Sequence, residues 1–176
     1  MALTFSNIDK TSQGEYVVDI SAQAGGPVFH QLNNVTLTID ASQGDATIKG
    51  DLSSLGKFND EILEYANGHS EEWFGRKVAE ATLAKAYQVQ DDGPFTADLL
   101  QNSDNEVITK YYGQDKELRD AGELTQEDLH VHVVVELRGL WFVKKNFGAI
   151  WKLVQVKDAP PPPPKSPYED YLFQDE

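Results

Sequence analysis

The stretch that decides the fold is residues 129–157, LHVHVVVELRGLWFVKKNFGAIWKLVQVK. Its first part, Leu129 to Leu137, is rich in valine and predicts a strand. A hairpin is expected next, with arms Leu140 to Lys144 and Ala149 to Lys157 closed through residues 145–148. We assign the other elements outward from this hairpin.

Upstream, residues 17–21, 34–41, 46–52, 95–100 and 106–112 read as strands. The spacing of Leu55, Phe58 and Ile62 predicts a helix that stops at Asn67-Gly68, and Ser70 is expected to cap a second helix that runs to about Tyr87. Many short strands with one helical insertion predict a mainly β domain of the α+β class, a small barrel or a sandwich, over residues 1–158.

Composition narrows the class of protein. The 176 residues fit one domain plus a tail, and none is cysteine, which excludes disulfides, thiolate catalysis and cysteine zinc sites. The chain shows no signal-peptide pattern and no apolar run of membrane-spanning length, so we expect an intracellular, non-secreted protein. No phosphate-binding glycine loop, dinucleotide fingerprint or nucleophile elbow is present, and we predict a non-enzyme without a cofactor.

Charge is distributed unevenly. The net charge is −14, which counts against nonspecific binding of duplex DNA. The segment from Leu137 to Lys157 nevertheless carries five cations and no acid. It also contains several aromatic residues, and single-stranded nucleic acid binds where bases stack on aromatic rings and cations follow the phosphates. The candidates here are Arg138, Trp141, Phe142, Lys144, Lys145, Phe147, Trp151 and Lys152. The alternative for the tryptophans is core packing.

A second candidate segment is His69-Ser70-Glu71-Glu72-Trp73-Phe74-Gly75-Arg76-Lys77. Trp73 or Phe74 could stack on a base while Arg76 or Lys77 holds a phosphate. The alternative is a helix anchored in the core by its aromatic residues.

These two segments, together with Asp60-Glu61-Ile62-Leu63-Glu64, resemble a family of predicted single-stranded-DNA-binding proteins of large DNA viruses. The resemblance covers roughly residues 28–156. It implies an OB-like antiparallel barrel that coats displaced strands during viral DNA replication, recombination or repair, in a host-cell replication compartment. RNA as a ligand and a homo-oligomeric state are left open.

The C-terminal segment, residues 159–176, predicts a stiff proline spacer, Pro160 to Pro164, followed by a disordered acidic aromatic tail. The tail is similar to those of bacterial and phage single-strand binders, which occupy the DNA groove or recruit replication enzymes such as polymerase or helicase. Here Phe173 is followed by three more residues instead of ending the chain. The residues assigned to autoinhibition or partner binding are Tyr168, Glu169, Asp170, Tyr171, Phe173, Asp175 and Glu176.

We therefore predict a sequence-tolerant single-stranded-DNA-binding protein whose tail controls access to DNA. The rival prediction is a protein-interaction or structural module without a nucleic-acid role, which the negative charge of the chain favours. His130 and His132 alternate on a strand and are weighed as zinc ligands. No further histidine cluster supports them, and we predict no metal site.

Overall fold

A computed structural model describes residues 3–11, 14–40, 44–88, 95–104, 106–120, 129–144 and 146–160. The strands of the first half are β1 (Leu3–Phe5), β2 (Asp9–Lys10), β3 (Tyr16–Ala22), β4 (Val28–Asp40) and β5 (Asp45–Lys49). A 3₁₀ turn (Ser53–Leu55), α1 (Gly56–Phe74) and α2 (Glu80–Ala86) follow. The later strands are β6 (Tyr87–Gln88), β7 (Phe95–Leu99), β8 (Lys110–Tyr112), β9 (Leu118–Arg119), β10 (Leu129–Val143) and β11 (Asn146–Asp158).

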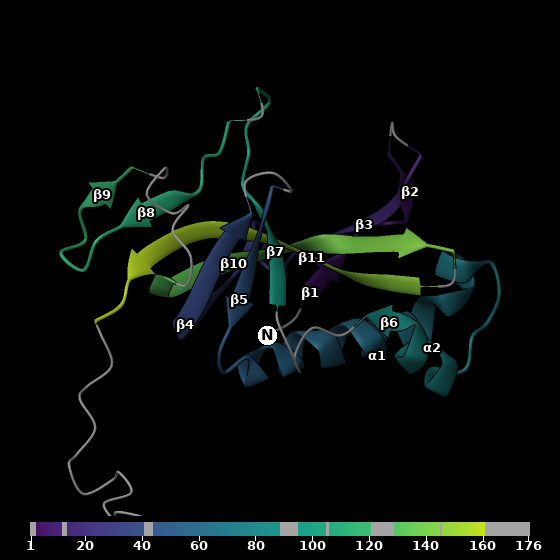
Figure 1. Ribbon diagram of the computed structural model, residues 1–176. Helices are drawn as coiled ribbons and strands as arrows, with labels where there is room; N and C mark the ends of the chain where they lie inside the picture. The colour runs from purple at the N-terminus through teal and green to yellow at the C-terminus, as the bar shows by residue number, and fades with distance from the viewer. Residues whose placement is uncertain are drawn as a thin grey trace, which may run out of the picture.

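Five strands close into a barrel (Figure 1). Their order is β10-β4-β5-β7-β11, and the β10–β11 pairing closes the ring. All neighbours in the ring are antiparallel except β7 and β11, which are parallel. The mainly β prediction is therefore confirmed, with a closed barrel in place of a sandwich.

The β10–β11 hairpin is longer and tighter than the sequence indicates. Val143 pairs with Asn146, so only Lys144 and Lys145 separate the two arms, and the prediction of a turn over residues 145–148 is wrong. The distal half of the hairpin extends past the ring and pairs with β3 through Leu140 and Trp141. This end of the molecule also holds β2, α2 and the end of α1 (Figure 1).

Two register shifts in the hairpin decide which side chains face the core. One lies between Leu137 and Gly139, so Leu137 and Leu140 are both fully buried although simple alternation puts them on opposite faces. Gly139 sits at this shift against β3, where a Cβ atom would lie 2.4 Å from the carbonyl oxygen of Val18. A larger residue would push the two strands apart.

Helix α1 covers the barrel with a stripe at helical spacing: Phe58, Ile62, Ala66 and Trp73 are buried. The predicted stop at Asn67-Gly68 lies next to a kink at His69, which has a non-helical φ of −130°, and the chain is helical again up to Phe74. The prediction that this second helix runs to about Tyr87 is wrong, because Gly75 ends it in the left-handed conformation and α2 starts separately at Glu80. The His69 ring stacks on Tyr65 with 3.8 Å between centroids, and its Nδ1 hydrogen-bonds the Tyr65 carbonyl at 2.9 Å.

Ser70 has a different role from the predicted one. Its side chain is buried, and its Oγ accepts a hydrogen bond from the Val78 amide at 3.0 Å. The bond fastens the segment between α1 and α2 back onto the helix, and Arg76 lies within that segment. Ser70 thereby helps to place a cation at the hairpin end of the molecule.

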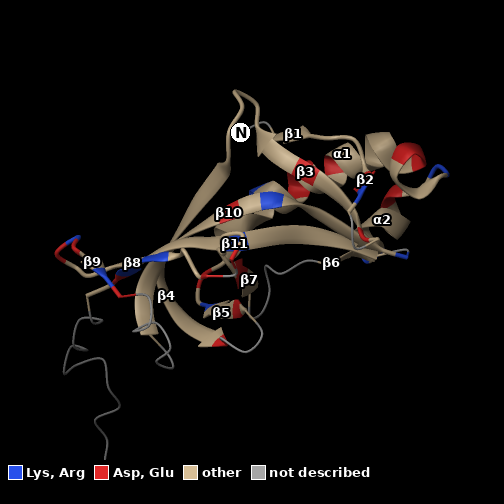
Figure 2. Ribbon diagram, turned by 90° about the horizontal axis from the view of Figure 1, so that it is seen from above, with Lys and Arg blue, Asp and Glu red and all other residues tan. Residues whose placement is uncertain are grey.

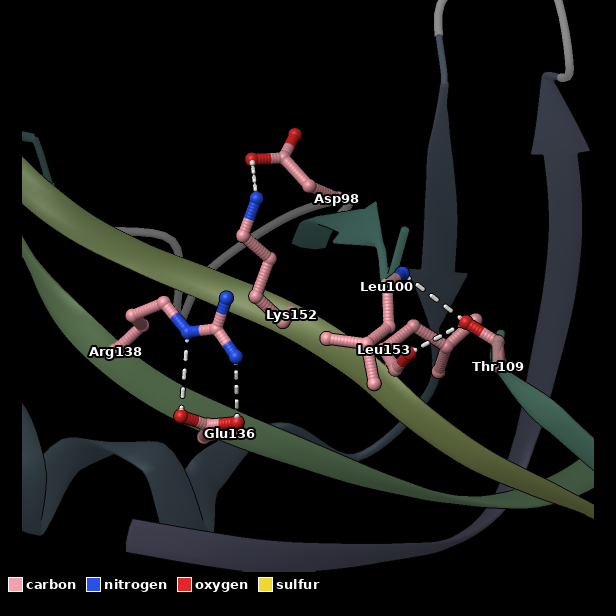
Figure 3. A network of polar contacts seen from close by, with 7 residues as sticks. All are labelled: Asp98, Leu100, Thr109, Glu136, Arg138, Lys152 and Leu153. Carbon is pink, nitrogen blue, oxygen red and sulfur yellow. Dashed lines mark hydrogen bonds and ion pairs between the residues drawn. The ribbon is translucent and has the colours of Figure 1, made fainter. Parts of the chain in front are cut away.

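The segment before β8 is fastened to β11 by a buried threonine. Thr109 Oγ donates to the Leu153 carbonyl at 2.7 Å and accepts from the Leu100 amide at 3.1 Å (Figure 3). β8 then pairs in parallel with the last part of β11, and β9 pairs with β8. The short β8–β9 arm therefore stands at the end of the barrel opposite the hairpin turn (Figure 1).

Candidate nucleic-acid interface

A groove of about 610 Å³ lies at the hairpin end of the molecule. Its apolar floor comes from the end of α1, from α2 and from the hairpin, with Trp73, Phe74, Leu83 and Phe142 among the lining residues. Arg76, Lys144 and Tyr16 also line it. The elements that meet here are far apart in sequence, which is why the groove cannot be read from any single segment.

Cations and one open aromatic ring mark this groove. Tyr16 on β3 is 48 % exposed, and Lys10 Nζ lies 5.7 Å from the centroid of its ring. Arg76 and Lys144 are exposed, and neither has an ion-pair partner within the described part of the chain. Glu72 is the one acid among the lining residues. The groove thus offers positive charge beside an aromatic face.

The hairpin turn presents Lys144 in the left-handed region of backbone space, with φ 56°. A lysine in this region is strained by about 1–2 kcal/mol relative to glycine. Two-residue hairpin loops favour turns with positive φ, so the short turn accounts for this conformation. The turn holds the Lys144 side chain at the groove.

Four of the five predicted stacking residues are buried, so the expectation that their rings face solvent is wrong. They are Trp73, Phe142, Phe147 and Trp151, and none is more than 7 % exposed. Phe147 lies between Phe142, at 5.7 Å, and Tyr87, at 5.1 Å. Trp151 meets Phe58 at 5.5 Å and Phe95 at 5.6 Å. These rings form an aromatic core between helix and barrel, as the core-packing alternative held.

Trp141 differs from the other four, because it points away from the core and is half-buried. Its cross-strand partner is Gly148. A Cβ atom on Gly148 would come within 2.7 Å of the indole, so the ring lies flat over the space that glycine leaves. One face of the indole therefore covers the sheet.

Two of the predicted phosphate contacts are engaged within the protein (Figure 3). Arg138 Nη2 lies 3.1 Å from Glu136 Oε1, and Lys152 Nζ lies 3.3 Å from Asp98 Oδ2. Glu136 and Lys152 are cross-strand neighbours on the outer face of the barrel. Arg138 and Lys152 of the basic strip are thus neutralised along the body of the hairpin, whereas Lys144 retains its charge at the turn.

The other predicted cations divide into two groups. Lys77 is exposed and follows Arg76 in the segment between α1 and α2. Figure 2 shows cations, in blue, at the end of the molecule that holds α2. Lys145 and all seven predicted tail residues lie outside the described residues. The structure therefore brings Arg76 and Lys144 together at the groove, whose lining does not include Lys77, Arg138 or Lys152.

The outer face of β4, β5 and β7 carries the opposite charge. Asp40 pairs across the sheet with Asp45, and Asp45 pairs with Asp98. Partial burial raises the pKa of Asp45, and the charges of Asp40 and Asp98 raise it further. This face would repel a phosphate backbone.

Tyr16 and Lys10 are binding candidates that the sequence does not reveal. They lie more than a hundred residues before the hairpin and reach it only because β3 pairs with β10, where Tyr16 faces Phe142. A tyrosine at the start of a predicted strand carries no signal of its own. Long-range strand pairing is the missing information.

One member of the histidine pair is engaged within the protein. His132 Nδ1 accepts a hydrogen bond from the Asn34 amide at 3.0 Å. Among the residues that the structure describes, no group of three histidine or carboxylate side chains is placed to hold a metal ion. Over the same residues, no helix is long and apolar enough to cross a membrane.

The fold and the groove define a small closed β-barrel protein with a helical cover and a basic hairpin end. The chain belongs to a family of unknown function, DUF5871, whose model matches residues 33–175. No curated protein and no solved structure matches the chain.

Proposed function

We propose that this protein binds single-stranded DNA, independently of sequence and without catalysis, at the groove beside the hairpin turn. The observation that carries the proposal is the meeting of Arg76, Lys144 and the open ring of Tyr16 at one groove of an otherwise acidic chain. Cations beside aromatic faces are what unpaired strands require.

The barrel supports the proposal through its topology. We interpret β4, β5, β7, β10 and β11 as the five successive strands of an OB fold, because their spatial order and the parallel β7–β11 pair match that Greek-key barrel. OB folds bind oligonucleotides with their second and third strands and with two loops, one of which joins strands four and five. Lys144 lies in that loop here.

The surface with which OB folds usually bind oligonucleotides is only partly suitable for binding DNA in this chain. Its second and third strands, β5 and β7, carry Asp45 and Asp98 on the outer face. We therefore place the strand of DNA at the hairpin end and away from the acidic face. Tyr16 and Phe74, which line the groove, take over the stacking role expected of the buried rings.

Fluorescence titration with oligo-dT tests this proposal. Trp73 lines the groove and Trp141 is half-buried at the same end, so bound bases should quench emission. Tyr16→Ala removes an exposed ring and should weaken binding by roughly 5- to 150-fold, since one stacked base is worth about 1–3 kcal/mol. Binding unaffected by Tyr16→Ala, or equal binding of duplex DNA, would contradict the proposed site.

The rival function, docking of a partner protein, is favoured by the burial of four predicted stacking rings and by the apolar floor of the groove. A groove of this size and lining also fits an apolar side chain of another protein. The same titration separates the two functions, because a pure interaction module leaves tryptophan emission unchanged when oligo-dT is added.

For the tail we propose control of DNA access by charge and recruitment of replication proteins. From Pro160 onward the chain has one lysine and four acids, so its charge is 1 − 4 = −3. Deletion of residues 160–176 should tighten oligo-dT binding, most at low ionic strength where charges are least screened. Unchanged affinity at low salt would refute this regulation.

A further inference from the structure

A second concave surface lies at the other end of the barrel. It is a hollow of about 240 Å³ between β8, β10, β11 and β4, with Tyr112, His132, Gln155 and Lys157 among its lining residues. None of its eight lining residues is acidic, although acids outnumber cations in the chain, 29 to 15. The hollow is remote from the groove and has no part in the proposed DNA site.

Side chains beside the hollow add a cation and an apolar group. Lys110 is exposed beside it, as the cross-strand partner of Gln155. Leu118 pairs with Tyr112 on the β8–β9 arm and is 64 % exposed. Asp158 is drawn toward Tyr111 and Arg119, with Tyr111 Oη donating to its carboxylate. The Asp158 carboxylate thus interacts with Tyr111 and Arg119 and not with the side chains that line the hollow.

His132 adds a hydrogen-bond donor. Because its Nδ1 accepts the Asn34 amide proton, its own ring proton is on Nε2. A carboxylate is an acceptor without protons, so it matches this donor and the ammonium groups of Lys157 and Lys110. An aromatic ring matches the apolar floor that Val134 and Tyr112 supply.

The chain leaves the barrel beside this hollow. The Ala159 amide donates to the His130 carbonyl at 3.2 Å, and Lys157 is the cross-strand partner of His132. Pro160 therefore starts about 10 Å along the strand from Lys157. Residues 168–173 of the sequence combine Tyr168, Tyr171 and Phe173 with two acids.

Reach favours the hollow over the groove for this segment. From Pro160, Tyr168 is at most about 29 Å away and Phe173 about 47 Å, at about 3.6 Å per fully extended residue. The hairpin turn is about 46 Å from Pro160 along β11. Tyr168 cannot reach the groove of its own chain and Phe173 only near full extension, whereas both can turn back to the hollow.

We propose that the acidic aromatic segment, residues 168–173, docks in its own chain's hollow at Tyr112, His132 and Lys157. An aromatic side chain fills the hollow, and Glu169 and Asp170 meet the cations around it. The docking does not depend on DNA binding. It holds the segment far from the groove, so its negative charge acts on DNA only over long range.

Paramagnetic relaxation tests the docking in the full chain. The chain has no cysteine, so Gln174→Cys gives a unique attachment point for a nitroxide label. The proposal expects loss of amide signals of Tyr112, His132 and Gln155, with those of Arg76 and Lys144 retained. Loss centred on Arg76 and Lys144, or no loss anywhere in the barrel, would overturn it.

Two controls complete the experiment. Lys157→Glu should restore the lost signals, whereas Lys49→Glu, an equal charge change at an exposed position of β5, should leave them lost. Loss that survives Lys157→Glu would contradict the assigned contact. The last control mixes nitroxide-labelled chain at natural isotope abundance with ¹⁵N-labelled chain that carries no nitroxide. The amide signals of the ¹⁵N chain should then be retained. Their loss would mean that the segment docks on another copy of the chain.

Discussion

The salt dependence of oligo-dT binding follows directly from the cations at the groove. Arg76, Lys144 and Lys10 are placed to contact phosphates, and each contact with a single strand contributes about −0.7 to the slope of log K against log salt. Three contacts give a slope of about −2, so affinity should fall roughly 20-fold between 50 and 200 mM salt. Fluorescence titration at four salt concentrations measures the slope.

The double variant Arg76→Glu with Lys144→Glu removes two of these contacts. Its slope should fall to about −0.7, and its affinity at low salt should fall more than at high salt. Lys49→Glu is the matched control and should keep the slope of the natural chain, since it changes charge away from the groove. A slope that the double variant leaves unchanged would refute the assignment of these cations.

Three further predictions concern the fold. Gly139→Ala should lower the free energy of unfolding by about 1–3 kcal/mol in thermal melts, because the new Cβ atom would clash with the backbone of β3. Gly68→Ala is the control: the space around Gly68 is open, so this variant should raise the free energy of unfolding or leave it unchanged. Phe147→Ala should lower the free energy of unfolding by about 3–5 kcal/mol, because the ring is fully buried. Phe147→Leu should fold and still bind oligo-dT. If folded Phe147→Leu lost binding, the ring would have to contact DNA after all. Partial burial, and to a smaller extent the charge of Lys57, lowers the pKa of His30 below its usual value of 6.5. Below pH 6.5, His30 is therefore protonated in the unfolded chain while it is still neutral in the folded chain. Stability should therefore decline as pH falls from 6.5 toward the folded pKa, and His30→Gln should flatten that decline in urea titrations; an equal decline in the variant would show that another group titrates.

Most strand positions could be predicted from the sequence because alternation and β-branched residues mark a strand locally, but the strand expected over residues 106–112 begins only at Lys110. Val133 and Val135 are buried at the centre of β10, within the predicted strand. Which aromatic residues of the hairpin face the core could not be predicted, because the register shift near Gly139 changes the alternation of faces along β10. Alternation defines two faces, but it does not show which face a helix will cover.

The helix break was predicted to within one residue, whereas the length of the second helix was not, because Gly75 ends it well before Tyr87. Asn67-Gly68 is a local stop signal, and the chain does kink one residue later, at His69. Burial of Trp73 against Phe142 and Phe147 favours continuation of the helix to Phe74. A tertiary contact of this kind outweighs the helix propensity of a single residue.

The candidate site was predicted in part. Lys144 and Arg76 do meet at one groove, whereas Lys152 and Arg138 are held by acids, one of which, Asp98, is remote in sequence. Glu136 lies two residues before Arg138, but only the geometry of β10 brings the two groups together. Charge counts along a sequence do not register such neutralisation.

Mapping of oligo-dT on the protein by amide chemical shifts tests the central claim most directly. The account predicts that the largest changes fall on Tyr16, Arg76 and Lys144, with the amides of Asp45 and Asp98 unchanged. Shifts centred on the face of β5 and β7, or a spectrum that oligo-dT leaves untouched at low salt, would contradict it.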